Sequence, residues 1–287
     1  MKSEYLIRSY SPIGLYPANS LIGEKAILFI SDEIVFSIVS LKQKIQFTSD
    51  TFWLLPEEIQ LCSAISLSVN PWEFGKIILY PNMPGFKVKF NETIKIKEII
   101  HTELLPIIKE KMKNRNGYSF DYSILPTFLS EINYQLNTNA KNIERQFQLF
   151  NAINIENKLL IRGLDSLLKS NALYCHPQFL VEACSLLHIS MEVSYHLVCE
   201  KADLNDLKPK LKVKKAQEYL SNIFGNNYEG QKYFEPYYED RIKIVHPISR
   251  FGLYSQPPIE PDDFYDLYED LISLYTYLLI GHINVFS

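Results

Sequence analysis

Arg241 and His246 are the side chains whose types and spacing best suit phosphodiester chemistry. They lie in the segment YYEDRIKIVHP, residues 237–247, and four residues separate them. Arginine carries a planar fork of donors that stays charged, so Arg241 can bind a scissile phosphate and stabilise the charge that develops on it. Histidine titrates near neutral pH, which suits His246 to act as general base on a ribose 2′-hydroxyl or as general acid to the leaving 5′-oxygen. Together they suffice for transesterification without a metal or cofactor.

Helix geometry restricts how these two side chains can meet. Five residues along an ideal helix turn a side chain by about 140°, which places Arg241 and His246 on different faces. Pro247 disfavours helical geometry at His246, and its ring would clash with the carbonyl of Lys243. We therefore expect the helix to end or kink at the histidine, which frees His246 to turn towards Arg241.

A purely structural interpretation of the same residues remains open. Arg241 can pair with Asp240, Glu239 or Glu192, and His246 can cap a helix C-terminus, where a positive charge is favourable. In the catalytic interpretation Glu192 is the candidate that orients Arg241. The supporting residues are then Glu192, Asp240 and Lys243.

A second constellation repeats every four residues and predicts one slowly drifting stripe on a helix. Its members are Cys184, His188, Glu192, His196 and Glu200. A cysteine and a histidine four residues apart can share a metal ion. Because no second ligand pair lies nearby in the sequence, we interpret the stripe as a polar surface that faces a cleft or a dimer partner, without a metal.

The first hundred residues indicate a β-rich domain, for which we set the bounds 1–98. Residues 26–40 hold two apolar, β-branched runs joined at Ser31 and Asp32, and residues 44–55 repeat the pattern. Shorter strands are expected at 75–80 and 86–90, on either side of a Pro- and Gly-containing turn. This domain contains no nucleotide-binding fingerprint and no nucleophile motif.

The rest of the chain has helical periodicity. Residues 99–154 are predicted to form a helical connector, which includes the stretches TFLSEINYQL and AKNIERQFQLF. Residues 155–287 are predicted to form an all-α bundle, so that the fold class is α+β. Its helices are expected at about 156–172, 177–201, 208–224, 239–246 and 262–283.

The C-terminal part resembles HEPN domains. An arginine, four to six residues and a histidine late in a helical bundle form that family's signature, and the segments IRGLDSLLKSNAL and EACSLLHISMEVSYHLV are similar to its preceding helices. The resemblance implies a homodimer with C2 symmetry, in which Arg241 and His246 cut single-stranded RNA to a 2′,3′-cyclic phosphate and a 5′-hydroxyl. It also implies a toxin or anti-phage defence effector, with domain 1–98 sensing a protein or ligand trigger.

Ile242 departs from this pattern, because many family members carry a polar residue directly after the arginine. It favours an alternative, a non-catalytic module that dimerises and binds RNA or a nucleotide. A protein with a purely structural role in an assembly is a third possibility. Labelled RNA distinguishes the three, because only the enzyme turns it over and only the first two bind it.

Charge excludes a protein that coats nucleic acid over its whole surface, since the formal net charge is −4. Basic residues nevertheless cluster twice, and each cluster is either a solvated helix face or a phosphate-contacting surface. The clusters are Lys109, Lys111, Lys113 and Arg115, and Lys208, Lys210, Lys212, Lys214 and Lys215.

Cysteine usage and the apolar segments predict a cytoplasmic protein that does not enter a membrane. The four cysteines have no C-x-x-C spacing, which is typical of a reducing compartment. Glu4 and Arg8 interrupt the N-terminus, so it does not resemble a signal peptide. The late apolar stretch 271–286 contains several polar groups and is short for a membrane span, so we expect a buried helix there.

Overall fold

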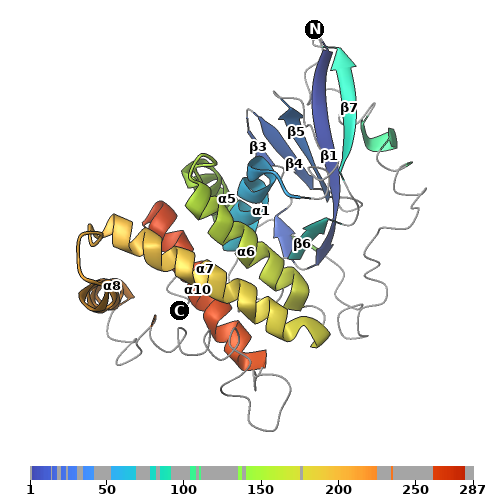
Figure 1. Cartoon of the computed structure of the whole chain (residues 1–287). Coiled ribbons are helices and arrows are strands. Elements are labelled where there is room, and N and C mark those ends of the chain that lie inside the picture. Colours follow the sequence, from blue (N-terminus) through green and yellow to red (C-terminus); the bar gives the residue numbers. More distant parts are fainter. Residues whose placement is uncertain are drawn as a thin grey trace. The chain divides into compact units, whose positions relative to one another are not determined.

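The computed structural model divides into two compact units (Figure 1). The first, here called the sheet unit, comprises Met1–Cys62 and Phe74–Ile143, and the second, the helical unit, comprises Ser63–Glu73 and Glu144–Ser287. The predicted connector 99–154 is thus divided between them. The structure describes residues 2–13, 15–17, 21–23, 25–30, 35–41, 53–68, 78–81, 85–91, 104–107, 110, 135–137, 140–174, 177–224, 234 and 261–281.

A six-stranded antiparallel sheet forms the centre of the sheet unit. The long strand β1 lies inside it and pairs with β5, β6 and β7. The strands are β1 (Lys2–Ile13), β3 (Leu21–Ile22), β4 (Ala26–Ile30), β5 (Val35–Leu41), β6 (Ile78–Pro81) and β7 (Phe86–Asn91). The sheet order is β3-β4-β5-β1-β6, with β7 also on β1. The strands predicted in 26–40 and at 86–90 are therefore confirmed. Of the strand predicted at 75–80, residues 78–80 belong to β6 and residues 75–77 lie outside the described part.

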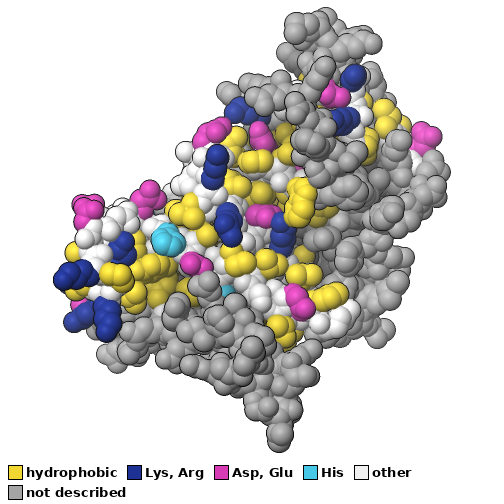
Figure 2. All heavy atoms as spheres, viewed as in Figure 1, with side chains coloured by type: hydrophobic (Ala, Val, Ile, Leu, Met, Phe, Trp, Pro, Cys, Tyr) yellow, Lys and Arg dark blue, Asp and Glu magenta, His cyan; other side chains and the backbone are white. Residues whose placement is uncertain are grey.

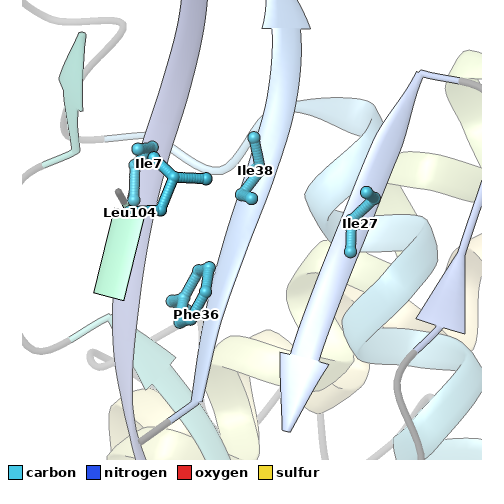
Figure 3. Close-up of a cluster of buried hydrophobic side chains, with 5 residues drawn as sticks. All are labelled: Ile7, Ile27, Phe36, Ile38 and Leu104. Atoms are coloured by element: carbon cyan, nitrogen blue, oxygen red, sulfur yellow. The ribbon is translucent and has the colours of Figure 1, made fainter. Parts of the chain in front are cut away.

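One face of this sheet carries a core of buried hydrophobic side chains (Figure 3). Ile7, Ile27, Phe36 and Ile38 come from three neighbouring strands, and Leu104 packs against them. Phe36 and Ile38 are two residues apart, as expected for one face of a pleated strand. Burial of such side chains contributes about 1.5–3 kcal/mol each, which holds the sheet to its register.

The sequence analysis missed helix α1 (Pro56–Ser68). Pro56 at its first position and the acidic Glu57 and Glu58 in its first turn are a favourable N-terminus. Its interior positions from 58 to 68 are mostly buried all round, so it has no contrast between an apolar and a polar face. The preceding residues 53–55 are not a strand, although the pattern 44–55 predicted one, and residues 44–52 lie outside the described part.

Helices dominate the second unit, and those that can be compared lie within a few residues of their predicted bounds. They are α5 (Ala140–Ala152), α6 (Lys158–Tyr174), α7 (Leu180–Lys201), α8 (Pro209–Phe224) and α10 (Pro261–Ile280). The fold class is α+β. Of the helices in the described ranges, none is long and apolar enough to cross a membrane. The predicted helix 239–246 lies outside those ranges.

Residues 135–137 correct another prediction. The helical signal of TFLSEINYQL extended over the first two of them, but all three form strand β8 (Gln135–Asn137). This strand pairs in parallel with β2 (Leu15–Pro17), which is distant in the sequence. The pairing supplies backbone hydrogen bonds that a weak local helix preference cannot outweigh.

Three helices meet closely around Gly163. Helices α6 and α7 lie side by side in opposite directions, and α10 packs on α7 (Figure 1). The Ser190 hydroxyl donates to the Gly163 carbonyl over 2.9 Å, and the Tyr275 hydroxyl donates to the Ser190 carbonyl over 2.9 Å. A Cβ atom at Gly163 would clash with the Tyr275 hydroxyl and with Val193. Glycine is therefore required here for close helix packing.

Candidate functional site

The predicted catalytic segment lies outside the described residues. This holds for Asp240, Arg241, Lys243 and His246. Glu192, the candidate that would orient the arginine, lies on α7 and is half-buried.

Helix α7 presents the predicted polar stripe. Cys184 and His188 at its start are buried, Glu192 is half-buried, and His196 and Glu200 are exposed. Side chains four residues apart drift slowly around a helix, and here the drift carries the stripe from the interior to solvent. Among the described residues, no group of three or more His, Cys, Asp or Glu side chains is arranged to hold a metal ion.

Phe234 anchors the chain shortly before the catalytic segment. Its side chain is buried, and its ring lies edge-on to Tyr195 of α7 with centroids 5.0 Å apart. Its backbone N–H donates to the Gln217 side chain of α8 over 3.3 Å. Edge-on aromatic pairs of this kind contribute about 0.5–1.5 kcal/mol beyond burial. Phe234 is therefore a fixed point of the chain that contacts both α7 and α8.

A group of lysines, here called the α8 lysine cluster, covers the N-terminal half of α8. Its members are Lys208, Lys210, Lys212, Lys214 and Lys215, of which Lys212 is half-buried and the others are exposed. Figure 2 shows these dark blue side chains gathered over α8. Glu218 partly offsets them, because its carboxylate lies 2.6 Å from the Lys215 ammonium and 4.0 Å from that of Lys214.

The sheet unit holds a buried ion pair that the sequence analysis did not find. Arg8 of β1 and Glu58 of α1 are both fully buried, and the Arg8 Nε donates to Glu58 Oε1 over 2.9 Å. The Arg8 Nη2 also donates to the Trp53 carbonyl over 2.7 Å. Burial acts to lower the pKa of the Arg8 guanidinium, but the adjacent Glu58 carboxylate raises this pKa above its ordinary value overall.

Further donors complete this network around the Glu58 carboxylate. The Ser37 hydroxyl donates to Oε1 over 2.8 Å, and the backbone N–H of Leu55 donates to Oε2 over 2.9 Å. The Tyr10 hydroxyl lies 3.4 Å from Oε1. Burial raises the pKa of the adjacent Cys62 thiol to about 12. A carboxylate so fully bonded and a thiol that stays protonated indicate a clamp between sheet and helix, with no nucleophile or free base.

No protein-family model, no curated protein and no solved structure matches this chain.

Proposed function

We propose that the helical unit is a HEPN-type domain and that the protein is a metal-independent endoribonuclease for single-stranded RNA, with Arg241 and His246 as its catalytic residues. The anchor at Phe234 carries the proposal. Six residues separate Phe234 from Arg241, a length of chain that spans at most about 25 Å. Tyr195, on which Phe234 packs, lies about one helical turn from Glu192 on α7.

This arrangement gives Glu192 a role. The half-buried Glu192 carboxylate is on the helix to which Phe234 is anchored, and in this proposal it contacts the Arg241 guanidinium. A carboxylate holds an arginine through short, charge-assisted hydrogen bonds and so fixes the fork that faces the phosphate. The exposed end of the stripe, at His196 and Glu200, then lies towards solvent, where RNA arrives.

The proposed reaction is an internal transesterification. The ribose 2′-oxygen attacks the phosphorus while His246 accepts its proton, and the bond from phosphorus to the 5′-oxygen breaks. That oxygen takes a proton from an imidazolium, either the same group or His246 of the partner subunit. Arg241 stabilises the negative charge on the phosphorane oxygens. Because one arginine and one histidine are few groups for this task, we propose that two copies with C2 symmetry complete the site.

The test uses 5′-labelled single-stranded RNA in excess EDTA. We expect wild-type protein to cut it to products ending in 2′,3′-cyclic phosphate, and Arg241→Ala and His246→Ala to lose this activity by about 10²-fold or more. Arg162→Ala is the matched control, because Arg162 is exposed on α6 and remote in sequence from the motif. Each variant must retain its fold and oligomeric state. Unchanged cleavage by either catalytic variant would refute the mechanism.

The biological role that we propose is that of a toxin or defence effector, with the sheet unit responding to a protein or ligand trigger. Such an enzyme would be latent until triggered. Cleavage that appears only on adding lysate from phage-infected cells, and that Arg241→Ala abolishes, is the expected result. Constitutive cleavage of every RNA tested would argue against a trigger.

Ile242 favours the second candidate, a dimeric module that binds RNA or nucleotide without cutting it. An apolar side chain next to Arg241 supplies no hydrogen bond to position the phosphate. Binding of labelled RNA with no turnover over hours between pH 6 and 8, with and without lysate, would decide for this candidate.

A further inference from the structure

We propose that the α8 lysine cluster binds the phosphate backbone of single-stranded RNA and leads it towards the catalytic segment. This inference rests on the proposed function for the identity of the ligand. The surface itself is defined by the exposure, charge and position of four lysines on α8 and of Lys208 directly before it.

The α8 lysine cluster lies at a position where its charges destabilise the folded protein. The N-terminal end of a helix carries a partial positive charge, which disfavours cations there. Lys210 and Lys214 are four residues apart and repel one another, as do Lys208 and Lys212. Such an arrangement destabilises α8 on its own. When a polyanion binds, the electrostatic contribution of the same lysines becomes favourable.

Within the described ranges, most of the positive charge of the cluster is not neutralised by carboxylates. Glu218 engages only Lys214 and Lys215. The Lys212 ammonium donates to the Asn205 carbonyl over 2.9 Å, which leaves its charge in place. Lys208 and Lys210 have no carboxylate within ion-pair distance among the residues that the structure describes. The N-terminal half of α8 therefore carries charge available to a ligand.

Position on α8 connects the cluster to the catalytic segment. Lys210, Lys214 and Gln217 follow one another at intervals of four and three residues, so they lie along one side of the helix. Gln217 is the residue that holds the backbone of Phe234. A strand bound along this side would run from the lysines towards the anchor from which the chain continues to Arg241.

The surroundings favour a flexible RNA over a membrane. Asp203 and Asp206 are exposed just before the helix, and they would repel a broad anionic lipid surface. A single strand can instead follow the lysines and avoid the acids. Leu211, 44% exposed between the lysines, offers an apolar contact for a base.

The test measures binding in the absence of turnover. His246→Ala protein is titrated against fluorescein-labelled oligouridylate by anisotropy at several salt concentrations. We expect Lys208→Gln, Lys210→Gln and Lys214→Gln together to weaken binding about tenfold or more and to reduce the salt slope by about 2. The control carries Lys87→Gln, Lys89→Gln and Lys158→Gln, which remove the same charge from exposed positions elsewhere.

The possible results separate this inference from the proposed function. Equal binding by the cluster variant and the control variant would overturn the inference, and so would the absence of RNA binding with retention on phosphatidylserine vesicles. If only the cluster variant loses RNA binding and the protein never cleaves RNA, the result would support the α8 lysine cluster as an RNA-binding surface. The same result would refute the proposed ribonuclease activity. A raised melting temperature of the cluster variant would exclude misfolding as the cause of weak binding.

Discussion

Two arginines in different units show how differently one side chain can be buried. Arg8 in the sheet unit is fully enclosed, and it donates to the Glu58 carboxylate and the Trp53 carbonyl. Arg145 on α5, in the helical unit, is half-buried. Its Nε and Nη2 atoms are shielded from water, yet they have no hydrogen-bond partner in the part of the chain that the structure describes.

The contrast extends to their neighbours and to their electrostatics. Glu58 accepts hydrogen bonds at both carboxylate oxygens, whereas Gln146, which follows Arg145 and is fully buried, has no partner for either side-chain amide atom within the described ranges. Burial lowers the pKa of the Arg145 guanidinium, while Glu58 raises that of Arg8. Burial of a charge therefore indicates neither stability nor instability until its partners are known.

The largest expected effect follows from breaking the Arg8 network. Arg8→Met leaves the Glu58 carboxylate buried without its counter-charge, which should lower the free energy of unfolding by about 3–5 kcal/mol. Urea denaturation followed by tryptophan fluorescence measures this change.

A double variant serves as the control for that prediction. Arg8→Met with Glu58→Met replaces both charges by apolar groups, which should recover much of the loss because no charge remains buried. Equal stability of the single variant and wild-type protein would show that the ion pair is dispensable.

A smaller loss is expected at Ser37. The Ser37 hydroxyl donates to the buried Glu58 carboxylate over 2.8 Å, so Ser37→Ala should lower the free energy of unfolding by about 1.5–3 kcal/mol. Ser63→Ala is the matched control: this buried hydroxyl on α1 has no partner among the described residues, and its removal should cost nothing. Similar losses in both variants would indicate that serine burial, rather than the network, determines the effect.

Alkaline pH should weaken the same network. Burial raises the pKa of Cys62 from 9.0 to about 12, so between these values the unfolded chain loses the thiol proton while the folded protein keeps it. The contribution is fully present below pH 9 and falls as pH rises, by about 1.4 kcal/mol per pH unit. Denaturation at pH 8 and pH 10 tests this. Cys62→Ala should reduce the pH dependence, and an unchanged slope in that variant would contradict the assignment.

The smallest expected effect, and one of opposite sign, is at Arg145. Arg145→Met removes a guanidinium whose shielded edge has no hydrogen bond, so the free energy of unfolding should rise by up to about 1 kcal/mol. The gain is small because the side chain is partly solvated. Arg162→Met, at an exposed site on α6, should change little. A loss comparable to that of Arg8→Met would reveal a counter-charge and remove the contrast between the two arginines.

The sequence predicted the elements with strong local periodicity and missed those defined by distant partners. Helices α6, α7, α8 and α10 have amphipathic patterns or clear boundaries, and they formed where expected. Helix α1 is buried on nearly all sides, without a contrast between an apolar and a polar face, and β8 depends on pairing with β2, so neither has a local signature.

The buried network was not predictable for a related reason. Arg8 stands in the run LIRSY of β1, whose residues 6–10 are all buried, and its partner Glu58 lies 50 residues away. A charged residue in a strand normally indicates the solvent-facing side of the sheet, so the sequence pattern does not mark Arg8 as buried. The Arg241 and His246 motif, by contrast, was predicted from its local spacing together with the resemblance to HEPN domains, and it stays a prediction. Phe234 was not recognised because a lone phenylalanine gives no signal of what it packs against.

The division of the chain has a consequence for protein synthesis. The helical unit needs Ser63–Glu73, whose Leu67 carbonyl accepts a hydrogen bond from Thr276 of α10 over 3.4 Å. A ribosome releases the first of these segments long before α10, so nascent α1 must wait for that helix. Because domains fold as units during synthesis, the helical unit can assemble only after α10 has left the ribosome. A product truncated before α10, or residues 144–287 made alone, should therefore be unable to form the complete bundle.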